Sequence, residues 1–297
     1  MASGPVQLAS LGGIARWMDD SVTKMLEGTV APMVSNATAA IWPFVTIAMS
    51  ISLMWYGWLI ATGAIATPVF TALRRVVNIA VIVGIAGAGG LYQTEIVGVM
   101  LDLPTAVTSV LTKEPATPAE LLDEAANKGA EIGTRITDRS PNSVTSPARA
   151  FTFMMVSVII TVISALLSAV GIIVLVAVKA GMGMVVVLGP LCLLAMLFEY
   201  TKGFFDKWVN QAVFFAIYGA LFAIVFSIII GMFGMLQQGL LDTTKADEIN
   251  VFSMLTAIVI FVAGAGFMIA QVPPIAARIS GGAGGGRISV PFLGKFG

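Results

Sequence analysis

The sequence is built from long apolar runs separated by short polar segments. Runs of roughly the twenty residues that a transmembrane helix needs occupy 41–62, 150–178, 212–236 and 251–271, and a shorter run occupies 76–91. In lipid, a helix satisfies its own backbone hydrogen bonds, whereas an open strand or loop does not. The pattern therefore predicts an all-α, polytopic helical membrane protein with about five transmembrane helices.

The N-terminal region, residues 1–40, is predicted to hold an amphipathic helix before the first two spans at 41–91. Within residues 6–33, apolar positions recur every three or four residues with charged positions between them. The apolar face is expected to contain Leu8, Leu11, Ala15, Met18, Val22, Met25 and Met33. Such a helix is typical of the membrane interface, and a helix packed on the rest of the protein is the alternative. No apolar segment precedes Arg16, so no cleaved signal peptide is expected.

The second apolar run and the polar segment after it predict two further features. Ala80, Gly84 and Ala88 recur every four residues and form an edge that another helix can approach closely. Residues 92–149 are polar and predict a large loop that carries one helix. Its start, Thr117-Pro118-Ala119-Glu120, resembles a capping box with proline at the first helical position. Its apolar face is expected to contain Leu122, Ala126, Gly129, Ile132 and Ile136.

Residues 150–272 are predicted to contain three spans and an unusual central segment. Lys179 is expected to close the third span. Residues 180–198 are apolar enough to cross a membrane, but Gly189-Pro190 interrupts them, which favours a re-entrant or interfacial segment. Pro273-Pro274 is expected to end the last helix and leave 273–297 as a flexible, glycine-rich tail.

Charge around the spans predicts the orientation. With five spans and the N-terminus outside, only Glu199 and Asp206 oppose the basic residues on the cytoplasmic side. Those basic residues are Arg74, Arg75, Lys179, Lys202, Lys207, Arg278, Arg287 and Lys295. A six-span arrangement, in which 180–198 cross, would place Arg74 and Arg75 outside. The five-span arrangement therefore fits the positive-inside rule better.

Composition narrows the function classes. The chain is 58% hydrophobic and 11% charged, with zero formal net charge, whereas soluble domains carry about 25% charged residues. It has no histidine, which excludes Cys/His and Ser/His catalysis and histidine-ligated metal sites, and its one cysteine, Cys192, is expected to be a buried, inert thiol. The assigned span cores hold no ionisable residue, which argues against a proton-coupled carrier or an intramembrane protease. We expect no cofactor, no metal and no enzymatic activity.

A short charged and aromatic patch follows the central segment. Glu199, Lys202 and Asp206 have helical spacing and are predicted to pair across one face, either as a solvated helix end or as a subunit contact. Lys207-Trp208-Val209-Asn210-Gln211 then opens a long apolar helix. Trp208 is an interfacial anchor by default and a contact hot spot if the chain assembles.

The same stretch resembles a known family. Gly189-Pro190-Leu191 within an apolar run, then Phe198-Glu199-Tyr200-Thr201-Lys202, then Lys207 to Gln211, is similar to the TrbL-type (VirB-six) polytopic inner-membrane subunit of type IV secretion systems. The resemblance implies a non-enzymatic subunit of a Gram-negative envelope machine, with a periplasmic N-terminus and large loop and a cytoplasmic C-terminus. It also implies that Gly189, Pro190, Lys202, Trp208 and Gln211 are functionally sensitive positions.

The resemblance further implies a set of partners. The chain would form a homo-oligomer, expected to be a pentamer, that serves as the platform for pilus growth from major and minor pilin. It would stand in membrane lipid on the path of translocated DNA or protein, next to the bitopic scaffold and ATPase subunits. An unrelated small-solute channel or transporter is the alternative function, and an intramembrane enzyme comes third.

Overall fold

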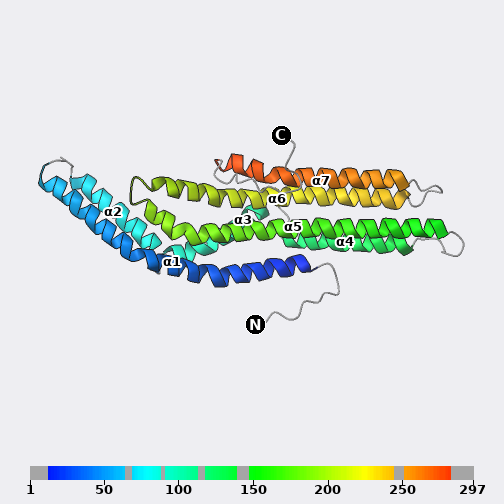
Figure 1. The fold of residues 1–297 in the computed structure, drawn as a ribbon, viewed down its shortest axis with the longest axis horizontal. Coiled ribbons are helices and arrows are strands. Elements are labelled where there is room, and N and C mark those ends of the chain that lie inside the picture. Colours follow the sequence, from blue (N-terminus) through cyan, green and yellow to red (C-terminus); the bar gives the residue numbers. More distant parts are fainter. Residues whose placement is uncertain are drawn as a thin grey trace.

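The computed structural model describes residues 13–63, 69–87, 91–112, 118–138, 147–243 and 251–281. Within these residues every regular element is a helix, which confirms the predicted all-α class. The elements are α1 (Ile14–Ala61), α2 (Val69–Ala86), the short π-helix η1 (Tyr92–Ile96), α3 (Val97–Thr112), α4 (Pro118–Asp138), α5 (Pro147–Ala195), α6 (Lys202–Thr243) and α7 (Val251–Ile279). They form an elongated bundle in which α5 and α6 run side by side along most of the length (Figure 1).

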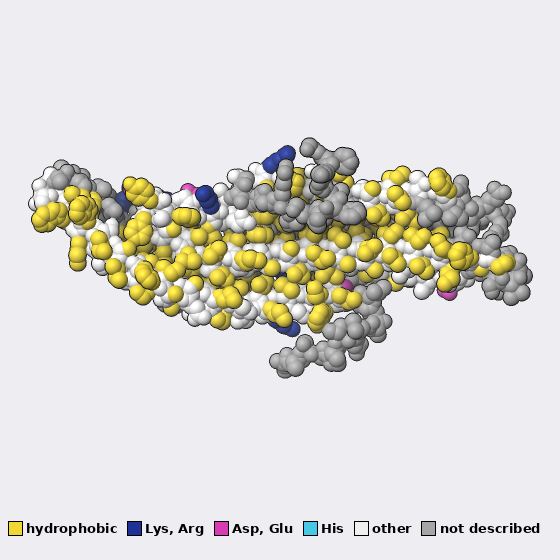
Figure 2. Space-filling model, in the orientation of Figure 1, with side chains coloured by type: hydrophobic (Ala, Val, Ile, Leu, Met, Phe, Trp, Pro, Cys, Tyr) yellow, Lys and Arg dark blue, Asp and Glu magenta, His cyan; other side chains and the backbone are white. Residues whose placement is uncertain are grey.

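Four of the described helices, α1, α5, α6 and α7, are long and apolar enough to cross a membrane. In α2 the apolar stretch covers only Val76–Ala86, so the described part of the predicted second span is too short to cross. With 49 residues, α5 is about 73 Å long, more than twice the ~30 Å of a bilayer's hydrocarbon core. The bundle therefore extends well beyond the membrane that it enters. Its visible surface is apolar along much of its length (Figure 2).

The N-terminal helix and the first span form one continuous helix. α1 passes through Pro32 and Pro43 without ending, so residues 1–40 and 41–62 are not separate elements where the structure describes them. Its most buried side chains are Ala15, Val30, Val34, Thr38 and Val45. Of the predicted apolar face, Ala15 is buried in the bundle, whereas Met25 and Met33 point outward with 70% and 51% of their surface exposed. Leu8 and Leu11 lie outside the described residues.

The polar segment at 92–149 is more structured than the predicted loop. It holds η1 and α3 in addition to the expected α4, and Tyr92 and Met100 are buried in a core cluster with Met182 and Val186. Helix α4 runs from Pro118 to Asp138, and Thr117 of the predicted capping box lies outside the described residues.

Helix α4 packs on α5 along the predicted face. Leu122, Ala126 and Ile136 are buried, and Gly129 and Gly133 lie directly against α5. A Cβ atom on Gly129 would lie only 1.8 Å from Ser164 Oγ, so the close approach requires glycine. The opposite face carries exposed ion pairs, Glu124 with Lys128 and Glu131 with Arg135. The charged face indicates that this side of α4 meets water.

The predicted re-entrant or interfacial segment at 180–198 is not a separate element. Helix α5 continues past Lys179 and Gly189-Pro190 to Ala195, and a turn then leads into α6. In that turn Thr201 Oγ1 donates to the Ala195 carbonyl at 2.6 Å. Pro273-Pro274 does not end the last helix either. Helix α7 continues to Ile279 because Val272, Ala276 and Ala277 are buried against the bundle, and this packing outweighs the hydrogen bonds that the prolines lose.

A carboxylate from α4 caps the first turn of α1. Asp123, 3% exposed, accepts hydrogen bonds from the Ala15 and Arg16 backbone N–H groups at 3.0 and 3.2 Å. The Arg16 Nε atom lies 3.6 Å from the same carboxylate. First-turn N–H groups have no partner within their own helix, and Gly13 before them has no side chain to offer. Asp123 therefore fixes the start of α1 against α4.

We expect Asp123→Ala to lower the free energy of unfolding by about 1–3 kcal/mol, because it leaves two buried N–H groups without an acceptor. Thermal unfolding of the detergent-solubilised protein, followed by circular dichroism, measures the change. Glu124→Ala is the matched control: it removes the neighbouring carboxylate from an exposed ion pair and should change stability by no more than ~0.5 kcal/mol. Equal effects of the two substitutions would contradict the capping role.

Candidate functional site

The Gly189-Pro190 step of α5 is the centre of a small polar network inside the bundle. Proline has no backbone N–H, so the Val186 carbonyl, four residues earlier, loses its partner within the helix. Tyr92 of η1 supplies the missing donor: its Oη atom donates to the Val186 carbonyl at 2.7 Å. Burial raises the pKa of the Tyr92 phenol above its ordinary value.

Trp208 of α6 approaches the same turn of α5 from another helix. Its indole Nε1 donates to the Val185 carbonyl at 2.7 Å, and its ring lies 6.3 Å from that of Tyr92, centroid to centroid. Two neighbouring carbonyls of α5 therefore receive side-chain donors from two other elements. Trp208 is half-buried. Within the chain, Trp208 therefore connects α6 to α5.

Gly189 allows Tyr92 to reach the carbonyl. A Cβ atom built on Gly189 would lie 1.7 Å from Tyr92 Oη and 2.1 Å from Cζ, which no rotamer change of a buried tyrosine relieves. The glycine and the proline therefore act as a pair, because the proline frees a carbonyl and the glycine opens the space for its new donor. We call Tyr92, Val186, Gly189, Pro190 and Trp208 the α5 proline site.

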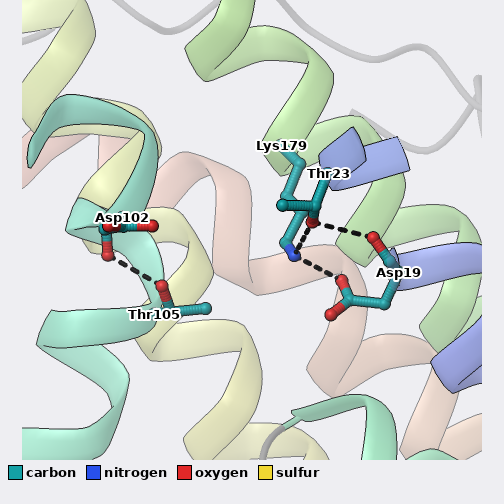
Figure 3. Close-up of polar contacts among 5 residues, drawn as sticks. All are labelled: Asp19, Thr23, Asp102, Thr105 and Lys179. Carbon is teal, nitrogen blue, oxygen red and sulfur yellow. Dashed lines mark hydrogen bonds and ion pairs between the residues drawn. The ribbon is translucent and has the colours of Figure 1, made fainter. Parts of the chain in front are cut away.

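A second polar cluster joins α1 to α5 (Figure 3). Lys179 Nζ lies 2.6 Å from Asp19 Oδ1 and donates to Thr23 Oγ1 at 2.8 Å. The Lys179 and Asp19 side chains are only 14% and 18% exposed. Lys179 does not end the helix, since it lies within α5 and pairs inside the bundle.

The cluster continues toward α3. A cavity of about 40 Å³ next to Lys179 is also lined by Thr23, Glu27, Asp102 and Thr105, and Thr105 Oγ1 donates to the Asp102 backbone carbonyl at 2.8 Å (Figure 3). This volume is sufficient for a water molecule. Among the residues that the structure describes, no group of three histidine, cysteine or acidic side chains lies close enough to hold a metal ion.

Comparison with known protein families assigns the chain that holds these two clusters to a family. The sequence matches the family described as "TrbL/VirB6 plasmid conjugal transfer protein" over residues 49–271. The chain belongs to the TrbL/VirB6 family. The matched range contains the whole α5 proline site, and membership makes the chain a membrane component of conjugal transfer and type IV secretion. A comparison with curated proteins finds no match.

The other residues that the sequence of this TrbL/VirB6 chain indicated as functional or topological positions lie mostly at its surface. Glu199 lies in the turn before α6 and not on a helix, and it forms no ion pair with Lys202 or Asp206 within the described residues. The predicted pairing across one face is therefore absent. Lys202, Asp206 and Lys207 are exposed, Gln211 is half-buried, and Arg278 lies in the last turn of α7. The structure brings Arg74 of α2 together with Glu199 and Lys202 in one groove.

The predicted packing edge of α2 is exposed at the two positions that the structure describes. Ala80 and Gly84 are exposed, and a Cβ atom on Gly84 would meet nothing within 4 Å. The nearby close approach is at Gly87, where an added Cβ atom would lie 3.2 Å from the Trp42 ring of α1. Ala88 and the side chain of Arg75 lie outside the described residues.

We expect Tyr92→Phe to destabilise this TrbL/VirB6 chain by about 1–3 kcal/mol, because it leaves the Val186 carbonyl buried without a donor. The midpoint of thermal unfolding in detergent measures the change. Tyr200→Phe is the matched control, since Tyr200 is fully exposed in the α5–α6 turn and should tolerate the same loss of a hydroxyl. An unchanged midpoint for Tyr92→Phe would mean that the hydrogen bond does not stabilise the proline turn.

Proposed function

We propose that the chain is a non-enzymatic inner-membrane subunit that assembles as a homo-oligomer, a pentamer, and serves as the platform on which a type IV secretion pilus grows. The family match over residues 49–271 is the observation that carries this proposal. Major and minor pilin would bind the platform, and the bitopic scaffold and ATPase subunits would surround it. The translocated substrate would pass beside it.

The roles of the interior polar groups support a structural function. Tyr92 and Trp208 donate to helix carbonyls, Asp123 caps α1, and Lys179 pairs with Asp19. Lys179 lies within α5, just beyond the predicted span core at 150–178, which holds no ionisable residue. The Lys179 side chain is held by two partners from α1, which favours a fixed inter-helix contact.

The exposed apolar surface supports assembly within the membrane. Along one face of the first half of α5, large side chains are exposed at Phe151, Met155, Val158, Val162, Leu166 and Ile173. Their spacing of three or four residues, with one gap, makes a continuous stripe on a helix. This stripe provides area for contacts with neighbouring copies and with lipid.

The distribution of positive charge supports pilus assembly over a DNA-lined conduit. Single-stranded DNA is bound by basic grooves with stacking aromatic rings. The predicted span cores contain no basic residue. Of the described basic side chains, Arg16, Lys128, Arg135 and Lys179 are paired with carboxylates, and the other five, Lys24, Arg74, Lys202, Lys207 and Arg278, lie outside those cores. The substrate path would therefore be formed jointly with other subunits.

Charge placement also supports an orientation with the N-terminus and α4 in the periplasm and the C-terminus in the cytoplasm. Arg74 and Lys202 line one groove, as expected if the α1–α2 and α5–α6 connections lie on the same side. The end of α7 that carries Arg278 lies near the first turns of α6, since Asn210 is 3.5 Å from a Cβ atom built on Gly281.

Cysteine labelling tests this orientation. In a Cys192→Ala background, a cysteine at Lys128 on the exposed face of α4 should react with a membrane-impermeant thiol reagent once the reagent passes the outer membrane. A cysteine at Asp206, exposed at the start of α6, should react only after the inner membrane is opened. The Cys192→Ala protein alone is the unlabelled control. The reverse pattern would overturn the orientation.

Deletion and reconstitution test the function. Removing the gene should abolish both conjugative transfer and surface pili, and the intact gene should restore both. Crosslinking of the full-length protein in membranes should give a ladder that stops at five copies, and major pilin should co-purify. A purified protein that instead carries solutes across liposome membranes, with transfer unaffected by deletion, would favour a small-solute channel or transporter.

A further inference from the structure

A groove of about 650 Å³ separates α2 from the turn between α5 and α6. Its polar lining residues are Arg74 and Asn78 of α2, Glu199 of the turn, and Lys202 at the start of α6. Its walls are apolar and include Ile82 and Leu197.

The two cations of the groove have no ion-pair partner in the described part of the chain. Neither Arg74 nor Lys202 forms an ion pair with any residue that the structure describes, although Glu199 lines the same groove. The charged lining side chains therefore sum to one positive charge. Two unpaired cations and an amide side chain, Asn78, form a set that a phosphate group fits.

Hydrogen bonds hold the turn that contains Glu199 and leads into Lys202. Thr201 Oγ1 donates to the Ala195 carbonyl at 2.6 Å and to the Phe198 carbonyl at 3.2 Å, so Glu199 and Lys202 lie on either side of a hydrogen-bonded turn. The apolar walls come from the end of α2, through Ile82, and from the turn itself, through Leu197. A ligand for this groove therefore needs both an anionic head and an apolar body.

We propose that this groove is a binding site for an anionic phospholipid, with the lipid phosphate between Arg74 and Lys202 and an acyl chain along Ile82 and Leu197. A zwitterionic lipid carries its own cation near the phosphate and gains less from the pair. A free phosphate ion fits the cations but leaves the apolar walls in contact with water. Basic sites at helix ends on the cytoplasmic side are where anionic lipids are expected to bind.

Native mass spectrometry of the full-length protein in detergent, titrated with phosphatidylglycerol, tests the proposal. The double variant Arg74→Gln/Lys202→Gln should weaken lipid binding by about tenfold or more, because each cation near an anionic surface contributes on the order of 1 kcal/mol. Glu199→Gln should strengthen binding, because it removes the one carboxylate among the described residues that line the groove. This opposite effect keeps the test decisive if the double variant fails to fold.

Three controls show whether lipid binding is specific to this groove. The double variant Lys128→Gln/Arg135→Gln removes the same charge from the exposed face of α4 and should leave binding unchanged within about twofold. Phosphatidylcholine should bind more weakly than phosphatidylglycerol, and glycerol phosphate should not compete. Equal losses in both double variants, equal binding of both lipids, or competition by glycerol phosphate would overturn the proposal. Loss of oligomer mass without loss of lipid would also overturn it and assign the groove to a neighbouring copy.

Discussion

The Val186 carbonyl sets the main constraint on the centre of this molecule. Pro190 removes its helical donor, and neither lipid nor an apolar core can replace it. Tyr92 supplies the donor, Trp208 adds a second donor to the carbonyl one residue away, and Gly189 leaves the space that the Tyr92 ring occupies. One step in α5 therefore joins three parts of the chain that lie far apart in the sequence.

Two other polar contacts also join helices that are distant in the sequence. Asp123 fixes the first turn of α1 to α4, and Lys179 joins α1 to α5 one to two turns further along α1. Apolar contacts between membrane helices are poorly specific, because lipid tails are as apolar as leucine. These few hydrogen bonds and ion pairs therefore determine which helices pair and in which register, while the apolar surface stays open to lipid and neighbours.

The sequence predicted the helices well and their ends poorly. Periodicity identified α4 and its buried face through Leu122, Ala126 and Ile136, because that helix has one wet side and one packed side. The expectations that Gly189-Pro190 interrupts a helix and that Pro273-Pro274 ends one were wrong, because tertiary contacts stabilise a helix that local propensity would end. Gly189, Pro190 and Trp208 were recognisable as a motif. Tyr92 was not, because its partner is 94 residues away, and only the orphaned carbonyl before the proline indicated that some donor was required.

The uninterrupted length of α5 has a mechanical consequence. A helix of 49 residues that stays intact through a glycine and a proline behaves as a single stiff rod, anchored at one end to α4 and at the other to the turn into α6. Because it is longer than the bilayer is thick, its two ends stand in different surroundings. Displacing the α4 end of such a rod along its axis would also displace the end at the turn into α6, so the two ends of the bundle are mechanically coupled through one helix.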